Sequence, residues 1–202
     1  MTRPMSDPRE EKRELREIGH ARRRSQPDKD RLSEEVCRKA MSLPEYVDAR
    51  TVMCYVDIRD EVRTRPLLRA ALDAGKRAVI PYCVAGDRLE LFRMESLDEL
   101  AVGTFGILEP ADAWRDRDDR RVEAAELDLI LLPGVAFDRR GGRIGHGKGY
   151  YDRLLERVRT DAATVALAFE CQIFDEIPMQ AHDVYMDMVI TETAVYRRTD
   201  VA

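Results

Sequence analysis

The sequence is poor in cysteine and contains no closely spaced cysteine pair. Its four cysteines, Cys37, Cys54, Cys83 and Cys171, are spread over 202 residues. A structural zinc site or a redox pair usually needs cysteines a few positions apart, and disulfide scaffolds belong to much shorter secreted chains. We therefore exclude these classes and expect Cys54 and Cys83, which lie in apolar runs, to pack as small hydrophobic residues.

Long apolar runs are also missing. No stretch approaches the ~18 apolar residues of a membrane helix, and residues 1–17 lack the apolar centre of a secretory signal. The net charge of −5 gives no reason to expect nucleic-acid binding. The run Arg22–Arg24 is the local exception, and because acidic residues surround it, we interpret it as a solvated helix face. We expect a cytoplasmic protein, a monomer, with no membrane or nucleic-acid partner.

Apolar residues make up 44% of the chain and charged residues 36%, which is typical of a folded chain rather than a disordered one. The length fits one domain with a full core. We expect residues 1–202 to form that single domain, with residues 1–9 disordered.

Strand and helix patterns alternate along the chain, which predicts an α/β fold. The strands are expected at 51–56, 77–82, 88–93, 127–133, 164–169 and 188–191. The helices are expected at about 9–24, after a capping box that Ser25 opens at 25–28, from the cap Thr64 to Gly75, and at about 149–159.

The almost wholly apolar segment 127–133 indicates a strand covered on both faces. The segments 77–82 and 88–93 are separated by a short turn and suit a hairpin at the sheet edge. We predict a three-layer sandwich with a mostly parallel central sheet and an edge hairpin. Ligands then gather at the carboxyl ends of the strands, just after residues 56, 133, 169 and 191.

The most informative segment is a glycine-rich loop that follows the apolar strand. Six of the eleven glycines lie within the sixteen positions 134–149, interleaved with Arg143, His146 and Lys148. Glycine lets the backbone approach a ligand closely, and successive N–H groups can cradle a phosphate. The loop therefore has the composition of an anion-binding loop, although a plain surface connection between strand and helix is the alternative.

Two familiar phosphate motifs nearly match this loop, and neither is complete. The spacing from Gly142 to Lys148 is that of a Walker A loop, but Gly149 stands where the magnesium-binding Ser or Thr is needed. A dinucleotide fingerprint starting at Gly145 fails because its last position is Tyr150. The motif alone predicts a phosphate loop of unknown type.

The segment PGVAFDRRGGRIGHGKGYYDRLL (133–155) closely resembles the signature of the 5-formyltetrahydrofolate cyclo-ligase family. Further segments resemble that family in the same order, namely KRELR (12–16), DEVRT (60–64), FGILEP (105–110), ALAFECQ (166–172) and HDVYMDMVITE (182–192). The resemblance implies an ATP- and Mg²⁺-dependent ligase that converts 5-formyltetrahydrofolate, with or without a polyglutamate tail, to 5,10-methenyltetrahydrofolate. It implies a phosphorylated formyl intermediate and release of ADP and phosphate.

The resemblance also implies roles for individual residues. Catalysis is expected of Lys12, Arg143 and Lys148. ATP is expected to contact Lys12, Arg16, Arg143, Ile144, Gly145, His146, Gly147, Lys148, Gly149, Tyr150 and Tyr151. The folate is expected to contact Val56, Glu61, Phe105 and Tyr151, and magnesium Asp152 and Asp183.

Plainer interpretations exist for single residues. Lys12 and Arg16 stand four apart on a charged helix and would ordinarily face solvent, and Asp152 could be an acid that the helix dipole favours. Two rival functions stay open at this point. One is a different enzyme on a similar sheet, such as a phosphosugar isomerase or a CoA transferase, and the other is a folate or nucleotide sensor without turnover.

Overall fold

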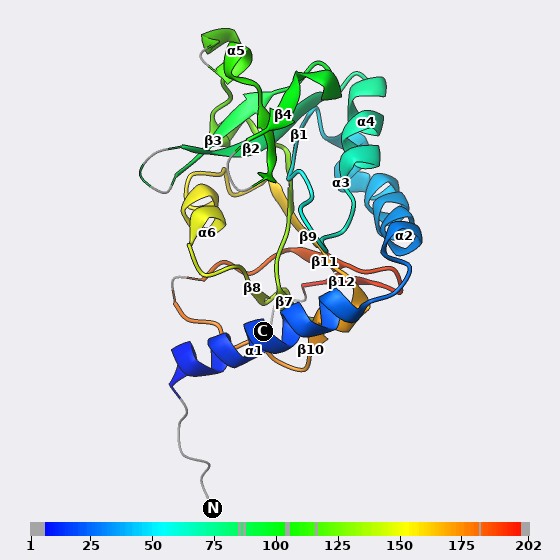
Figure 1. The fold of residues 1–202 in the computed structure, drawn as a ribbon, viewed down its shortest axis with the longest axis vertical. Coiled ribbons are helices and arrows are strands. Elements are labelled where there is room, and N and C mark those ends of the chain that lie inside the picture. Colours follow the sequence, from blue (N-terminus) through cyan, green and yellow to red (C-terminus); the bar gives the residue numbers. More distant parts are fainter. Residues whose placement is uncertain are drawn as a thin grey trace, which may run out of the picture.

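The computed structural model describes residues 7–84, 86, 88–103, 106–115, 117–181 and 183–198. Its centre is a seven-stranded sheet with the order β12-β11-β9-β6-β1-β2-β3 (Figure 1). The strands of this sheet are β1 (Thr51–Cys54), β2 (Arg77–Val84), β3 (Arg88–Arg93), β6 (Leu129–Leu132), β9 (Ala163–Leu167), β11 (Met188–Ile190) and β12 (Val195–Arg197). The five inner strands run parallel, and both edge strands run antiparallel to their neighbours.

The apolar strand β6 occupies the middle of the sheet, between β1 and β9. All four of its residues are buried, because helices or packed loops cover both faces. A strand covered on both sides has no solvent face that would need polar residues, so its sequence shows no alternation. The mostly parallel sheet and the β2–β3 edge hairpin confirm the predicted fold class.

Helices cover both faces of the sheet and complete the three layers (Figure 1). The helices are α1 (Pro8–Ser25), α2 (Lys29–Ser42), α3 (Pro44–Asp48), α4 (Arg65–Asp73), α5 (Asp112–Arg115) and α6 (Tyr150–Leu155). On one face, α2, α3 and α4 bury Val36, Tyr46 and Leu67 against the sheet. On the other face, α6 buries Leu154 and Leu155. Helix α1 crosses one end of the molecule, next to the small strands β7, β8 and β10 (Figure 1).

Two small sheets accompany the main one and were not predicted. Their strands are β4 (Leu100–Val102) with β5 (Leu108–Pro110), and β7 (Ala136–Asp138) with β8 (Arg143–Ile144) and β10 (Ile173–Phe174). Strands of two or three residues are too short to display a two-residue repeat, so the sequence pattern gives no signal for them. The second small sheet shapes the glycine-rich loop, because β7 and β8 both lie within residues 134–149 and pair with each other.

Of the two predicted helix caps, the one at Ser25 is wrong, whereas Thr64 is the N-cap residue of α4 but makes no cap bond with its side chain. Ser25 ends α1 instead of opening α2, and its hydroxyl donates to the Arg22 carbonyl oxygen. Thr64 does precede α4, but its side chain makes no cap hydrogen bond. Its hydroxyl donates to the Tyr55 carbonyl oxygen at 2.7 Å instead. In both cases a nearby carbonyl acceptor competes successfully for the hydroxyl. The helix expected at about 149–159 is shorter and ends at Leu155.

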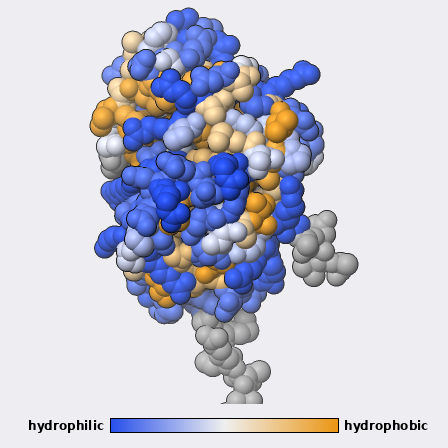
Figure 2. Space-filling view, turned by 90° about the vertical axis from the view of Figure 1, so that its right-hand side faces the viewer, coloured by the Kyte–Doolittle hydropathy of each residue, from blue (hydrophilic) through white to orange (hydrophobic). Residues whose placement is uncertain are grey.

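The face that carries α2 and α4 is mainly hydrophilic, with scattered apolar patches (Figure 2). Single exposed apolar residues are normal on a folded protein and mark no binding site by themselves. Within the described part of the chain, no helix has the length and apolarity needed to cross a membrane.

Candidate active site

A cavity of about 790 Å³ opens beside the glycine-rich loop. Its wall comes from five parts of the chain: α1, the loop after β1, strands β2 and β3 with β5, the segment from Pro133 to α6, and the loop before β11 with Gln180 and Asp183. The predicted site residues that line it are Lys12, Arg16, Val56, Glu61, Arg143, Ile144, Gly145, His146, Gly147, Lys148, Gly149, Tyr150, Tyr151, Asp152 and Asp183. Phe105 lies outside the described residues, although its neighbours Ile107 and Leu108 line the same cavity.

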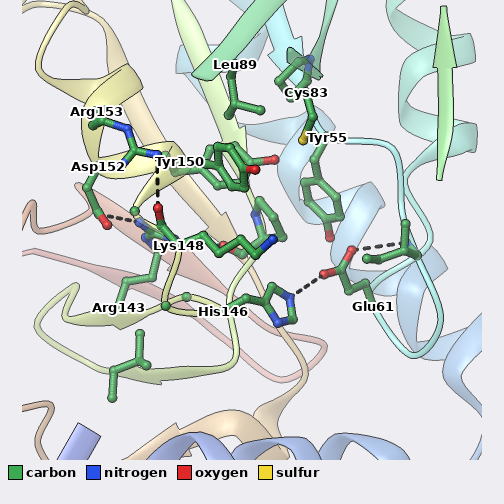
Figure 3. A pocket seen from close by; sticks show the side chains of 18 of the residues that line it. Tyr55, Glu61, Cys83, Leu89, Arg143, His146, Lys148, Tyr150, Asp152 and Arg153 are labelled. Atoms are coloured by element: carbon green, nitrogen blue, oxygen red, sulfur yellow. Dashed lines mark hydrogen bonds and ion pairs between the residues drawn. The ribbon is translucent and has the colours of Figure 1, made fainter. Parts of the chain in front are cut away.

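The cavity has an apolar end and a charged end (Figure 3). Tyr55, Cys83 and Leu89 form part of the apolar end, whereas His146 and Lys148 project from the loop at the charged end. A site of this kind suits a ligand with a flat ring system on one side and anionic groups on the other.

The glycine-rich loop owes its path to backbone conformations that favour glycine. Gly147 and Gly149 have φ values of 91° and 66°, and Gly149 is the N-cap of α6. Non-glycine residues rarely adopt such values without strain. The loop is tied to α1 by Arg16, whose Nε donates to the Gly145 carbonyl oxygen at 2.9 Å.

Helix α1 forms one wall of the cavity through a single face. Lys12, Arg16, Gly19 and Arg23 stand four, three and four positions apart, a spacing that places them on the same side of the helix. A Cβ on Gly19 would lie 2.6 Å from the Val135 carbonyl oxygen, so only glycine allows α1 to pack this closely. Gly19 and Arg23 were not predicted as site residues, although the sequence shows their helical spacing from Lys12 and Arg16.

Arg23 corrects the interpretation of Arg22–Arg24 as a solvated face. Arg22 and Arg24 are exposed, but Arg23 is only 4% exposed. Its guanidinium donates to the Gly134 carbonyl oxygen at 3.0 Å and lies 3.8 Å from Glu61 Oε1. A run of three charged residues on a helix points in three directions, so the middle residue can be buried while its neighbours stay in water.

Glu61 is buried and held by its own loop. Its backbone N–H donates to the Ile58 carbonyl oxygen at 3.0 Å, and its Oε2 accepts from the Ile58 N–H at 3.1 Å. Asp57 and Thr64 close the loop, since each backbone N–H donates to the other's side chain. The carboxylate is therefore fixed at the cavity wall before any ligand arrives.

The charge of Glu61 acts on its aromatic neighbours. Burial, followed by the Glu61 carboxylate, raises the pKa of Tyr55 well above its ordinary value. Burial, followed by the Glu61 carboxylate, also raises the pKa of Tyr151 well above its ordinary value. Both phenols therefore stay neutral at physiological pH and are hydrogen-bond groups rather than bases. His146 approaches Glu61 from the glycine-rich loop, with Nε2 3.4 Å from Oε1 (Figure 3).

The two aspartates predicted to hold magnesium are both ion-paired. Asp183 pairs with Lys12 across the cavity, and Asp152 accepts from Arg143 Nη2 at 2.7 Å. No group of three or more His, Cys, Asp or Glu residues suited to a metal occurs among the described residues. Two hard carboxylates fit a magnesium ion that brings phosphate oxygens and waters with it, and they do not fit a metal held by protein ligands alone.

Arg143 is buried beneath the loop rather than projecting from it. Besides Asp152, its guanidinium donates to the Pro133 carbonyl oxygen at 3.3 Å, and its Nε has no hydrogen-bond partner in the described part of the chain. These contacts hold the loop and Asp152 in place. A direct contact between Arg143 and a phosphate stays a prediction.

Only half of the predicted sheet edge contributes to the cavity. Residues after β1 and β6 line it, whereas those after β9 and β11 do not. Glu170 and Thr191, which follow these strands, bond to each other instead, and α1 lies against the short helix η5 (Glu170–Gln172). The N-terminal helix therefore covers the part of the edge that a bare sheet would leave open.

The whole arrangement matches known proteins in sequence and in structure. The model of the 5-formyltetrahydrofolate cyclo-ligase family matches residues 8–192. The chain belongs to this family.

Among curated relatives, the probable 5-formyltetrahydrofolate cyclo-ligase of Schizosaccharomyces pombe is 33% identical, over 83% of this chain and 87% of its own. The 5-formyltetrahydrofolate cyclo-ligase of Mus musculus is 31% identical, over 90% and 93%.

Solved structures agree with the family assignment. The NMR structure of 5,10-methenyltetrahydrofolate synthetase from Aquifex aeolicus has a TM-score of 0.80 and 39% identity, and the match covers 95% of this chain and 94% of that one. The 5,10-methenyltetrahydrofolate synthetase of Mycoplasma pneumoniae has a TM-score of 0.71 at 22% identity, covering 90% and 98%, and supports the fold alone.

Proposed function

We propose that this cyclo-ligase family member converts 5-formyltetrahydrofolate to 5,10-methenyltetrahydrofolate with consumption of ATP in the presence of magnesium. The observation that supports this most is the meeting of three segments at one cavity. The glycine-rich loop, the Lys12–Arg16 face of α1 and the buried Glu61 lie far apart in sequence and line the same space. We also propose that residues 1–202 act as one domain.

In the proposed chemistry, phosphorylation turns the formyl oxygen, a poor leaving group, into a good one. The formyl oxygen attacks the γ-phosphorus of ATP, the bond from that phosphorus to the bridging oxygen breaks, and ADP leaves. N10 of the folate then bonds to the formyl carbon and loses its proton. The carbon–oxygen bond to phosphate breaks, and inorganic phosphate is released. Such reactions depend mainly on positioning and on neutralisation of phosphate charge.

The residues divide between the two ends of the cavity. Lys12, Arg16 and the loop 143–151 would hold the phosphates, with Lys12 and Lys148 close to the transferred group. Glu61 would accept hydrogen bonds from the N–H donors of the pterin, which the apolar end of the cavity would surround. Asp152 and Asp183 would hold magnesium, which when bound spreads the charge of the phosphoryl group.

Absorbance of the methenyl product provides a direct test. Purified protein should form product only when ATP, a divalent metal and 5-formyltetrahydrofolate are all present. Product without nucleotide, or no product under any condition, contradicts the proposal. Binding of both ligands without turnover would instead favour a sensor.

A matched pair of variants tests the nucleotide side of the site. Lys12→Met removes a buried cation, and we expect ATP affinity to fall about 10- to 150-fold, equivalent to a charge-assisted contact of roughly 1.5–3 kcal/mol. Arg13→Met removes the adjacent exposed cation and should leave affinity unchanged. Equal effects of the two variants would contradict the assignment of Lys12.

A further inference from the structure

His146 stands between the two halves of the cavity. It belongs to the glycine-rich loop proposed for the nucleotide, yet its nearest polar partner is Glu61, proposed for the folate, at 3.4 Å from Nε2 to Oε1. Its side chain is 44% exposed, whereas that of Glu61 is 5% exposed. Gly145 and Gly147 flank it, and neither carries a side chain that would anchor the backbone beside it.

The His20 ring packs beside the His146 ring. The two rings lie 5.3 Å apart between centroids and are inclined by 31°. Burial lowers the pKa of His20 to about 4, and nearby Arg23 and His146 add to this effect. The His20 ring is therefore neutral at physiological pH. It packs against His146 without adding a second cation near Glu61.

The contact with His146 occupies an oxygen that a folate would need. Glu61 Oε2 is already used by the Ile58 N–H, and Oε1 faces Arg23 and His146. Arg23 is fixed by its bond to the Gly134 carbonyl oxygen. Of the two side chains beside Oε1, His146 is the more exposed and sits on the loop that an anion would engage.

We propose that His146 is a positioning residue that couples the two ligands, and that His20 holds it in its resting place. In the free protein His146 engages Glu61. Phosphate in the loop attracts the imidazole, Glu61 Oε1 is released, and the pterin donors can bind it. This inference rests on the proposed function, because it takes the loop as the nucleotide site and Glu61 as the folate site.

Calorimetry measures the coupling directly. The affinity of wild-type protein for 5-formyltetrahydrofolate should rise at least fivefold when a non-hydrolysable ATP analogue and magnesium are saturating, the lower end of usual coupling between sites. His146→Ala should bind the folate without nucleotide as tightly as the wild type binds it with nucleotide. Its affinity ratio with and without the analogue should fall to about one.

His20 has a separate prediction in the same assay. His20→Ala should reduce the wild-type ratio, whereas His20→Phe, which keeps a ring against His146, should restore it. In the His146→Ala background His20→Ala should have no further effect, because the ring it supports is gone. A purely structural role of His20 would lower stability in both backgrounds without changing the ratio.

Nuclear magnetic resonance adds a readout that is independent of folate binding. The chain has three histidines, so the imidazole signals of protein labelled with ¹⁵N-histidine can be assigned by substitution. Glu61→Gln should shift the His146 signal in the free protein but not in the complex with the ATP analogue.

Three outcomes overturn the proposal. They are a wild-type affinity ratio of one, a His146→Ala ratio equal to the wild-type value, and a His146 signal that responds to Glu61→Gln equally with and without the analogue. Absence of any folate binding by the wild type is a different result, because it overturns the proposed function as well.

Discussion

Replacing Arg23 with methionine should destabilise the protein far more than its place in a run of three arginines suggests. The side chains of Arg23 and Glu61 are each 5% exposed, and the closest nitrogen and oxygen lie 3.8 Å apart. Methionine fills a similar volume and carries no charge. The substitution therefore leaves the Glu61 carboxylate beside a cavity wall without its fixed cation.

The expected magnitude follows from this geometry. Two unit charges 4 Å apart interact by about 4 kcal/mol at an effective dielectric constant of 20. Removal of one partner of a buried pair costs roughly 3–5 kcal/mol, because the remaining charge stays desolvated. For a chain of this length each kcal/mol lowers the melting temperature by about 2–4 °C, so we expect a decrease of roughly 6–20 °C.

Thermal and urea unfolding of three variants and one control measure this effect. Arg23→Met and Glu61→Gln should each destabilise, and the double variant should recover part of the loss because no unpaired charge remains. Arg24→Met is the control, since Arg24 is exposed one position along the same helix, and it should change stability by less than about 0.5 kcal/mol. If Arg23→Met unfolds like Arg24→Met, the Arg23–Glu61 pair contributes nothing and the reasoning is refuted.

Three further predictions concern the metal, the docking of α1 and the response to pH. Asp152→Asn and Asp183→Asn should each raise the magnesium concentration needed for turnover while circular dichroism stays unchanged. Wild-type magnesium dependence in both would show that the metal is held elsewhere. Gly19→Leu should displace α1, because its Cβ would lie 2.6 Å from a backbone carbonyl oxygen. Weaker ATP binding in calorimetry is the expected result, and unchanged affinity would contradict it. The folded-state pKa of His20 is about 4, below its ordinary 6.5, so the unfolded chain takes up the proton first and stability falls as pH drops from 6.5 towards 4. His20→Gln should remove this part of the pH dependence in urea unfolding, and an identical pH profile would show that His20 does not contribute.

The sequence predicts those strands whose pattern of polar and apolar residues is set by burial. Segment 127–133 is apolar throughout because both faces of that strand are covered, which indicates a central strand. Polar and apolar residues alternate along β3, which indicates a strand at the sheet edge. The strands β7 and β8 are too short for either signal. The cap predicted at Ser25 is wrong, and the N-cap residue Thr64 lacks a side-chain cap bond, for a different reason. The Ser25 hydroxyl donates to the Arg22 carbonyl oxygen in its own helix, and the Thr64 hydroxyl donates to the carbonyl oxygen of Tyr55 at the other end of its loop.

The candidate site was predictable where a segment carries its own motif. The glycine-rich loop is such a segment, and it lines the cavity. The Arg23–Glu61 and His20–His146 contacts join distant segments whose local sequences are ordinary for charged helices and loops. Their partners become visible only when α1 is placed against the loops, which is why both were missed.

The docking of α1 has a consequence for synthesis of the protein. The partner of Lys12, Asp183, lies 171 residues further along the chain, and Gly134, which accepts from Arg23, lies 111 residues further along. At 5–20 residues per second, a ribosome takes roughly 10–30 s to cover the longer interval. Until Asp183 has been synthesised, α1 can be helical but cannot complete its docking. Its inward face carries the charged residues Lys12 and Arg23. The undocked helix therefore exposes a charged stripe to water and offers few apolar contacts through which a neighbouring nascent chain could aggregate with it.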